Sequence, residues 1–149
     1  MPKAYRVTPF VRVTNRLTST MLRAGLSFNS MVLVTVPGRK SGAPRTVPVS
    51  MIERGGERYL IGAFGQVNWV RNLRAARGGT LRKGRVVEEF EAVELAAKDA
   101  APILQAALQR APGYVRSFFD VTAESSLVDV EREAVHHPVF QLKMPAPTR

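Results

Sequence analysis

Pro37-Gly38-Arg39-Lys40-Ser41-Gly42-Ala43-Pro44-Arg45-Thr46-Val47-Pro48 links an apolar run of residues, 31–36, to a second one at 46–52. Glycine and proline between two β-rich runs predict a hairpin loop. Its glycines let an anion approach the backbone N–H groups, and its three cations add charge. The loop is therefore a candidate for binding a phosphate or carboxylate, although a merely solvated hairpin tip has a similar composition. A Walker-type phosphate loop is excluded, because that motif requires glycine directly before the lysine.

This stretch resembles the signature of the deazaflavin-dependent nitroreductase family, small split β-barrel proteins that use coenzyme F420. Two further matches follow in the same order, Trp-Val-Arg-Asn-Leu-Arg-Ala-Ala at 69–76 and His-Pro-Val-Phe at 137–140. The resemblance covers roughly residues 15–143. It implies an α+β protein whose split β-barrel has about six mostly antiparallel strands, with an N-terminal helix and short peripheral helices.

Length and composition indicate one globular domain spanning residues 1–149. The formal net charge of +10 favours an anionic partner, either a charged coenzyme, a membrane surface or nucleic acid. Nucleic acid is the weakest of these, because no recognition helix or aromatic RNA-binding motif is present. The chain has no cysteine, no apolar run long enough to span a bilayer and no signal peptide. We therefore expect a cytoplasmic protein, either a monomer or a homodimer.

Hydrophobic patterning predicts the order of the secondary-structure elements. Strands are expected at 31–36, 45–53, 58–63, 80–83, 85–95 and 139–143. A short helix is expected at 68–76, with Asn68 as its N-cap and Gly78 and Gly79 ending it. Asp99 is expected to cap a second helix that has Pro102 in its first turn and ends near residue 110. Residues 120–134 are predicted to be irregular or briefly helical, and the tail from about 144 to 149 to be frayed.

An amphipathic helix is predicted at about residues 8–26. Phe10, Leu17 and Leu22 follow a spacing close to helical, and arginines lie around them at Arg12, Arg16 and Arg23. Such a helix could pack on the barrel, lie on an anionic membrane surface, or do both. The second role would place the protein at the inner face of the membrane.

No combination of residues in the sequence indicates a catalytic triad, an acid pair or a metal site. The only two histidines, His136 and His137, are adjacent and point to opposite faces of an extended chain, so they cannot easily share a metal. We interpret them as one surface histidine and one packed at the start of a strand. Ser41 lacks the context of a nucleophile elbow. If the protein is an enzyme, its reactive group therefore comes from a cofactor.

The resemblance implies where F420 would bind. The family's tail-binding loop and the helix beside the coenzyme correspond here to a set of candidate contacts. These are Arg39, Lys40, Ser41, Gly42, Arg45, Pro48, Ala63, Phe64, Gly65, Asn68, Trp69 and Asn72. Of these, residues 63–65 are candidates for contact with the deazaflavin ring. This chain departs from the family just after them, because the longer Gly-Gly-x-x-x-His-Pro segment is here Gly-Gln-Val-Asn at 65–68.

These features together favour an F420H2-dependent oxidoreductase that passes a hydride to an apolar, electron-poor acceptor such as a quinone, nitro compound or enone. Tyr114, Phe118 and Phe119 are candidates for the wall of the acceptor pocket, and Tyr114 is also a candidate hydrogen-bond donor. A lipid- or coenzyme-binding module with little turnover is an alternative. A barrel of the same shape that holds FMN is another.

Overall fold

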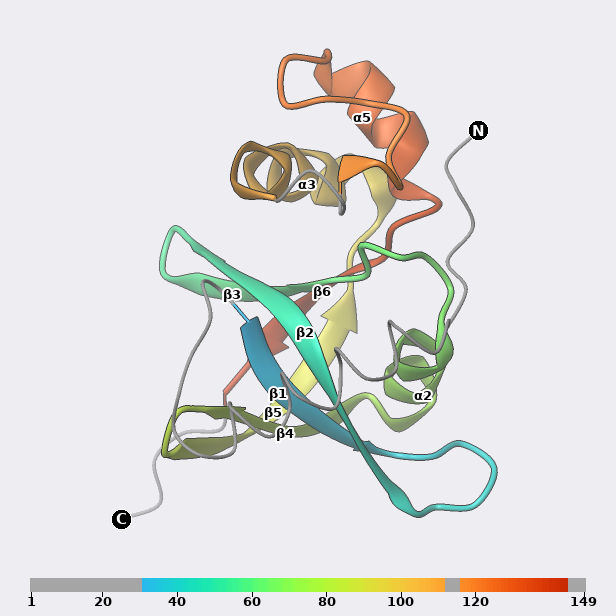
Figure 1. Ribbon diagram of the computed structural model, residues 1–149, viewed down its shortest axis with the longest axis vertical. Coiled ribbons are helices and arrows are strands. Elements are labelled where there is room, and N and C mark those ends of the chain that lie inside the picture. The colour runs from blue at the N-terminus through green and yellow to red at the C-terminus, as the bar shows by residue number, and fades with distance from the viewer. Residues whose placement is uncertain (1–30, 112–115, 145–149) are drawn as a thin grey trace.

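A computed structural model describes residues 31–111 and 116–144 of the chain. Six antiparallel strands close into a barrel in the order β1-β2-β3-β6-β5-β4 (Figure 1). Their bounds are Met31–Pro37 (β1), Pro44–Arg54 (β2), Glu57–Ile61 (β3), Gly78–Lys83 (β4), Val86–Glu94 (β5) and Val139–Lys143 (β6). This confirms the expected α+β fold with a six-stranded antiparallel barrel. The predicted N-terminal helix at 8–26, Tyr114 and residues 145–149 lie outside the described residues.

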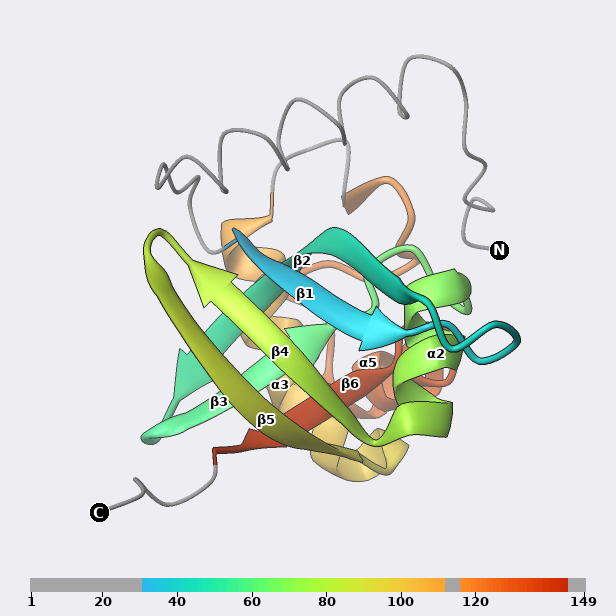
Figure 2. The ribbon, with the colours of Figure 1, turned by 90° about the horizontal axis from the view of Figure 1, so that it is seen from below.

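The barrel interior follows from strict alternation along β1. Val32, Val34 and Val36 point inward and are almost completely buried, as period-two patterning requires. In the β1–β2 hairpin Val34 lies opposite Val47, so both strands present the same apolar face. Helix α2 (Asn68–Ala76) contributes its buried Val70 and Leu73 to this same cluster. Figure 2 shows α2 beside the end of the barrel where the β1–β2 loop projects.

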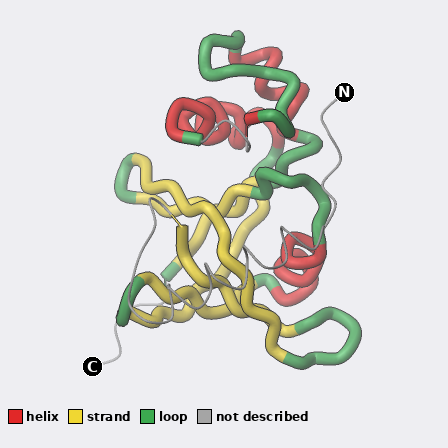
Figure 3. The backbone as a smooth tube through the Cα atoms, in the orientation of Figure 1, coloured by secondary structure: helices red, strands yellow, loops and turns green. Residues whose placement is uncertain are grey.

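A second core lies outside the barrel, between the sheet and two further helices. Helix α3 (Ala97–Arg110) and helix α5 (Leu127–Ala134) stack over one side of the barrel (Figures 1 and 3). They bury Leu104 and Val130 against outward-facing residues of the strands, such as Ile61 and Val139. One wall of the barrel is therefore covered by the two helices. Their packing fixes the position of the segments that connect them to the strands.

The start of β4 differs from the prediction. Gly78 and Gly79 do not end helix α2; they are the first residues of the strand, and the helix ends at Arg77 in a left-handed conformation. A Cβ atom at Gly78 would lie 2.6 Å from the carbonyl oxygen of Phe90, and one at Gly79 would meet the carbonyl of Thr35. The two glycines are therefore required for close approach of β4 to both neighbouring strands.

The predicted helix starts were also displaced. Val67, not Asn68, is the N-cap of α2, and it provides no side-chain hydrogen bond. Helix α3 begins at Ala97 after an N-cap at Ala96, so Asp99 lies inside its first turn and Pro102 lies further in. An acidic side chain in the first turn still interacts favourably with the helix dipole, which explains why the sequence signal pointed to this place.

Met144, which was predicted to belong to the frayed tail, packs against the barrel core. Among the described residues, no helix is both long and apolar enough to cross a lipid bilayer.

Candidate functional site

The β1–β2 loop, residues 38–43, is held in shape by its own backbone. The Gly38 N–H donates to the Ala43 carbonyl at 2.8 Å, and the Gly42 N–H donates to the Gly38 carbonyl at 2.8 Å. Gly42 has a φ of 75°, a conformation that favours glycine. The Ser41 hydroxyl accepts from the Ala43 N–H at 3.2 Å. The loop is thus an ordered turn at the end of a long hairpin.

Arg39 ties this loop to helix α2. Both its backbone N–H and its guanidinium Nη1 donate to Oδ1 of Asn72, at 3.1 and 2.8 Å. A longer contact of 3.5 Å reaches Oδ1 of Asn68. Asn72 is only 5 % exposed, so its amide oxygen is satisfied by Arg39. The predicted site residues Arg39, Asn68 and Asn72 therefore lie together. The strongest contacts among them are the two that Arg39 makes with Asn72.

Lys40 in this loop and Arg45 near the start of β2 are the other two cations of the stretch that was predicted to bind an anion. Lys40 and Arg45 are exposed, and neither forms an ion pair within residues 31–111 and 116–144. Pro48 lies further along β2, half-buried and opposite Leu33. Together with the exposed Ser41 and Gly42, the two cations form a positive rim beside the N-terminal end of α2.

A tightly held segment, residues 62–67, leads into α2; we call it the pre-α2 segment. Its Gly62 N–H donates to the Pro138 carbonyl at 2.7 Å, and a Cβ atom at Gly62 would lie 3.0 Å from that same oxygen. Gly65 has a φ of 89°, and a Cβ there would lie 3.3 Å from the His136 carbonyl. The predicted ring-contact residues Ala63, Phe64 and Gly65 are therefore on a segment with little freedom to move.

Aromatic residues from two distant parts of the chain meet at this segment. The Phe118 ring contacts the Phe64 ring edge to face, with centroids 4.9 Å apart. Its neighbour Phe119 turns the other way, stacks on the His137 imidazole at 3.8 Å and packs against the second core. The structure thus places Phe118, and not Phe119, against a predicted ring-contact residue.

Trp69 and Asn72 are three positions apart in α2 and therefore lie on the same side of the helix. Its ring is half-buried, packs against the barrel core and lies 6.2 Å from Phe140. Asn68 at the start of the helix is exposed. One face of this helix end therefore supports the barrel, while Asn68 is exposed beside Arg39.

Sequence reasoning gave no role to the buried pair of Glu133 and His137. His137 is 2 % exposed and Glu133 is 6 % exposed, whereas His136 is exposed, which confirms one packed and one surface histidine. Nε2 of His137 lies 2.8 Å from Oε1 of Glu133, and Nδ1 lies 2.9 Å from the Ala63 carbonyl oxygen. Burial lowers the pKa of the His137 imidazole, and the hydrogen bond to Glu133 opposes that shift. The His-Pro motif was the available signal, but its partner on α5 is visible only in the fold.

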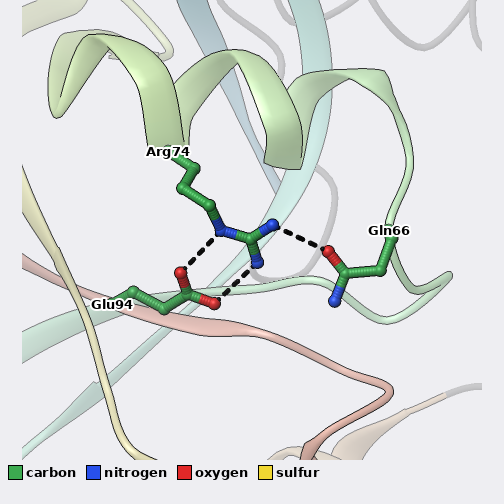
Figure 4. A network of polar contacts seen from close by, with 3 residues as sticks. All are labelled: Gln66, Arg74 and Glu94. Atoms are coloured by element: carbon green, nitrogen blue, oxygen red, sulfur yellow. Dashed lines mark hydrogen bonds and ion pairs between the residues drawn. The ribbon is translucent and has the colours of Figure 1, made fainter.

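A second polar network holds the pre-α2 segment from the other side. Arg74 of α2 makes two hydrogen bonds of 2.8 Å to the Glu94 carboxylate at the end of β5 (Figure 4). Its third contact, at 3.0 Å, is to Oε1 of Gln66. The hydrogen bond to Glu94 raises the pKa of the Arg74 guanidinium, which therefore stays charged. Arg74 thus links the helix, a barrel strand and the segment in front of the helix.

The described residues contain no group of three histidines, cysteines or acids that could hold a metal ion. The predicted site residues among them offer cationic, amide and aromatic contacts around a rigid segment. Such a site can bind and orient a charged, flat molecule, but it offers no evident nucleophile.

Comparison with known proteins identifies that molecule. The profile of the F420H(2)-dependent quinone reductase family matches residues 9–127, most of the chain. The chain belongs to this family. It is an F420H2-dependent oxidoreductase, and its cofactor is coenzyme F420. No curated protein matches the chain.

Solved structures show the same fold at low sequence identity. An F420-H2 dependent reductase is 23% identical with a TM-score of 0.54, covering 77% of this chain and 95% of that one. A structure described as a domain-swapped dimer is 22% identical with a TM-score of 0.57, covering 91% and 100%. General stress protein 26 of Bacillus anthracis is 7% identical with a TM-score of 0.53, covering 87% of each chain. At these identities the likeness concerns the fold alone.

The residues of the site suit this coenzyme. Its tail is a phosphodiester that bears several glutamates, and the exposed Lys40 and Arg45 flank a glycine-bearing turn whose shape is already set. A flat, largely apolar ring can lie beside Phe64, which is half-buried on a rigid backbone.

Proposed function

We propose that the β1–β2 loop binds the polyanionic tail of F420 and that the pre-α2 segment, residues 62–67, carries its ring. The observation that supports this most strongly is the contact between the loop and α2. Arg39 is bonded to Asn72, which leaves Lys40 and Arg45 free to meet the tail next to the exposed Asn68. Charge-assisted contacts of this kind give both affinity and orientation.

The acceptor we propose is an apolar, electron-poor molecule, with a quinone as the leading class. The family's name supports this class, and the Phe64–Phe118 pair offers an apolar surface next to the proposed ring position. When bound, reduced F420 supplies a hydride and a proton, which together convert a quinone to a hydroquinone. The protein's own contribution is then to hold the two partners together and to exclude water between them.

Placement explains why no acid or base stands out among the residues at the site. A near-attack arrangement of two bound molecules can supply many kcal/mol of the barrier, roughly 7–11, without any proton transfer by the protein. Tyr114, which lies close in sequence to Phe118, remains our candidate donor to the anion that develops on the acceptor.

The test is a titration of the purified protein with F420 and, separately, with FMN, followed by single-turnover oxidation of bound F420H2 by menadione. We expect binding of F420, no comparable binding of FMN and rapid oxidation when the quinone is added. Tight F420 binding without oxidation by menadione, a nitro compound or an enone would favour a coenzyme-binding module instead. Tighter binding of FMN would contradict the assignment of the site.

Two proposals concern assembly. The basic, amphipathic pattern of residues 8–26 supports association with an anionic membrane surface, where apolar quinones dissolve. Co-sedimentation with anionic and neutral vesicles tests it, and equal, negligible binding to both would contradict it.

A similar structure is described as a domain-swapped dimer, and we propose a homodimer for this chain as well. Light scattering coupled to size exclusion would show the mass of one or two chains.

A further inference from the structure

The pair of Glu133 and His137 is buried, polar and unused by the mechanism proposed above. Glu133 is on α5, and His137 lies just before β6. The backbone N–H of Asp120 also donates to Oε1 of Glu133, at 3.3 Å. Burying such groups costs free energy unless they are fully hydrogen-bonded, and no buried side-chain N or O atom among the described residues lacks a partner. The pair is thus a complete network, which raises the question of what it holds.

The contacts of the imidazole define its protonation. The Ala63 carbonyl oxygen can only accept a hydrogen bond, so Nδ1 of His137, 2.9 Å away, must carry a hydrogen. The other nitrogen, Nε2, lies 2.8 Å from Oε1 of Glu133, and this second hydrogen bond sets the orientation of the ring. Glu133 thus holds the imidazole at Nε2, and the Nδ1 hydrogen is donated to the Ala63 carbonyl.

The acceptor of that hydrogen bond belongs to the pre-α2 segment. The Ala63 carbonyl lies between the two places where the segment touches the 136–138 backbone, at Gly62 and at Gly65. Phe119 covers the face of the imidazole while its neighbour Phe118 contacts Phe64. His137 is thus connected to the backbone of the segment and, through Phe119 and Phe118, to its aromatic side chain.

We propose that His137, oriented by Glu133, is a positioning residue for the deazaflavin ring, because it fixes the Ala63 carbonyl and with it residues 63–65. This inference rests on the proposed site, in which the ring lies against that segment. The proposed tail contacts lie elsewhere, with Lys40 in the β1–β2 loop and Arg45 near the start of β2. Disturbing His137 should therefore slow hydride transfer at saturating coenzyme much more than it weakens coenzyme binding.

The experiment compares two double variants that differ in one hydrogen bond. In E133Q/H137N the asparagine amide can take the place of Nδ1 and still donate to the Ala63 carbonyl. In E133Q/H137Q the glutamine amide reaches instead toward position 133, and the carbonyl loses its donor. Both variants are uncharged at these positions, so the unpaired buried charge that either single change could leave is avoided.

Single-turnover oxidation of bound F420H2 by menadione is the main measurement. We expect E133Q/H137Q to slow this step by about ten- to a hundredfold, since displacement of a reacting group by 1 Å can cost about a hundredfold. E133Q/H137N should recover most of that loss, and both variants should keep a similar dissociation constant for F420. Equal slowing in the two variants, or none in E133Q/H137Q, would overturn the proposal. His136→Gln, at the exposed neighbour, is the matched control and should behave like the unmodified protein.

A second measurement needs no coenzyme and no change to the buried pair of Glu133 and His137. The chain has only two histidines, so nitrogen NMR of the labelled, unmodified protein resolves His137 once the His136→Gln spectrum is compared. We expect Nδ1 of His137 to be protonated throughout the neutral range. An unprotonated Nδ1 would overturn the proposal, whatever the kinetics show. Failure of the unmodified protein to oxidise F420H2 would instead count against the proposed function.

Discussion

Lys40 and Arg45 are the residues on which the assignment of the tail-binding site depends most directly. Both are exposed beside a preformed turn, and a charge-assisted hydrogen bond to a phosphate or carboxylate contributes roughly 1.5–3 kcal/mol. We expect Lys40→Ala or Arg45→Ala to weaken F420 binding by about ten- to a hundredfold. Titration followed by coenzyme fluorescence measures this. Lys98→Ala, an exposed lysine on α3, is the control, and unchanged affinity in both loop variants would remove the loop from the site.

Asn72 supports the β1–β2 loop through its contacts with Arg39. Its buried amide oxygen accepts two hydrogen bonds from Arg39, so Asn72→Ala should leave the loop unattached to α2. We expect a loss of about 1–3 kcal/mol in the free energy of unfolding, together with weaker F420 binding. Urea denaturation and coenzyme titration measure the two effects. Arg71→Ala, exposed on the same helix, should change neither; a similar loss in that variant would mean that α2 in general is sensitive.

At the scale of elements, α5 and the start of β6 are coupled to the pre-α2 segment by a titratable group. Burial lowers the pKa of His137 below its ordinary value near 6.5, so at pH values just under that value the unfolded chain binds a proton that the folded chain resists. Stability should therefore fall as pH decreases from about 6.5 to the lowered pKa, by up to about 1.4 kcal/mol for each pH unit.

This pH dependence can be assigned to one residue. Unfolding by urea between pH 5 and pH 7.5 should show the slope in the unmodified protein and in His136→Gln, because that variant keeps His137 and its partners. E133Q/H137N should lack it. An unchanged slope in that double variant would place its origin elsewhere in the chain.

Glycines 78 and 79 illustrate what element-level patterns miss. A Gly-Gly pair after a helical pattern is an ordinary signal for the end of a helix, and α2 does end just before the pair, with Arg77 as its C-cap. The glycines are nevertheless strand residues, because β4 must pass close to the backbones of both β1 and β5. Nothing local in the sequence distinguishes the two roles, since the clash that excludes larger residues comes from strands distant in sequence.

For the whole molecule the relevant quantity is the net charge of +10. If exposed cations attract the polyanionic tail, the attraction is screened over a Debye length that shortens from about 10 Å at 0.1 M salt to about 3 Å at 1 M. We expect the dissociation constant for F420 to rise steadily as sodium chloride is increased over this range. A flat profile would mean that burial of the ring dominates binding and that the tail contributes little.

The sequence alone was sufficient to predict the fold class, the coenzyme, and the positions of the β1–β2 loop and helix α2 in the chain. Alternation of apolar residues along strands and glycine-bearing turns are local features, and the motifs at 37–48 and 69–76 are contiguous in the chain. Whatever depends on spacing within one element was therefore readable, including the shared side of Trp69 and Asn72 on α2.

Only the tertiary structure decided which of the candidate residues contact one another. Arg39 and Asn72 are 33 positions apart, and His137 and Ala63 are 74 apart. Each pair meets because closure of the barrel brings loops from different strands to one end, and a buried polar group must then find its partner among whatever is nearby. That requirement pairs Arg39 with Asn72. It also pairs His137, to which the sequence pattern gave no role, with the Ala63 carbonyl of the pre-α2 segment.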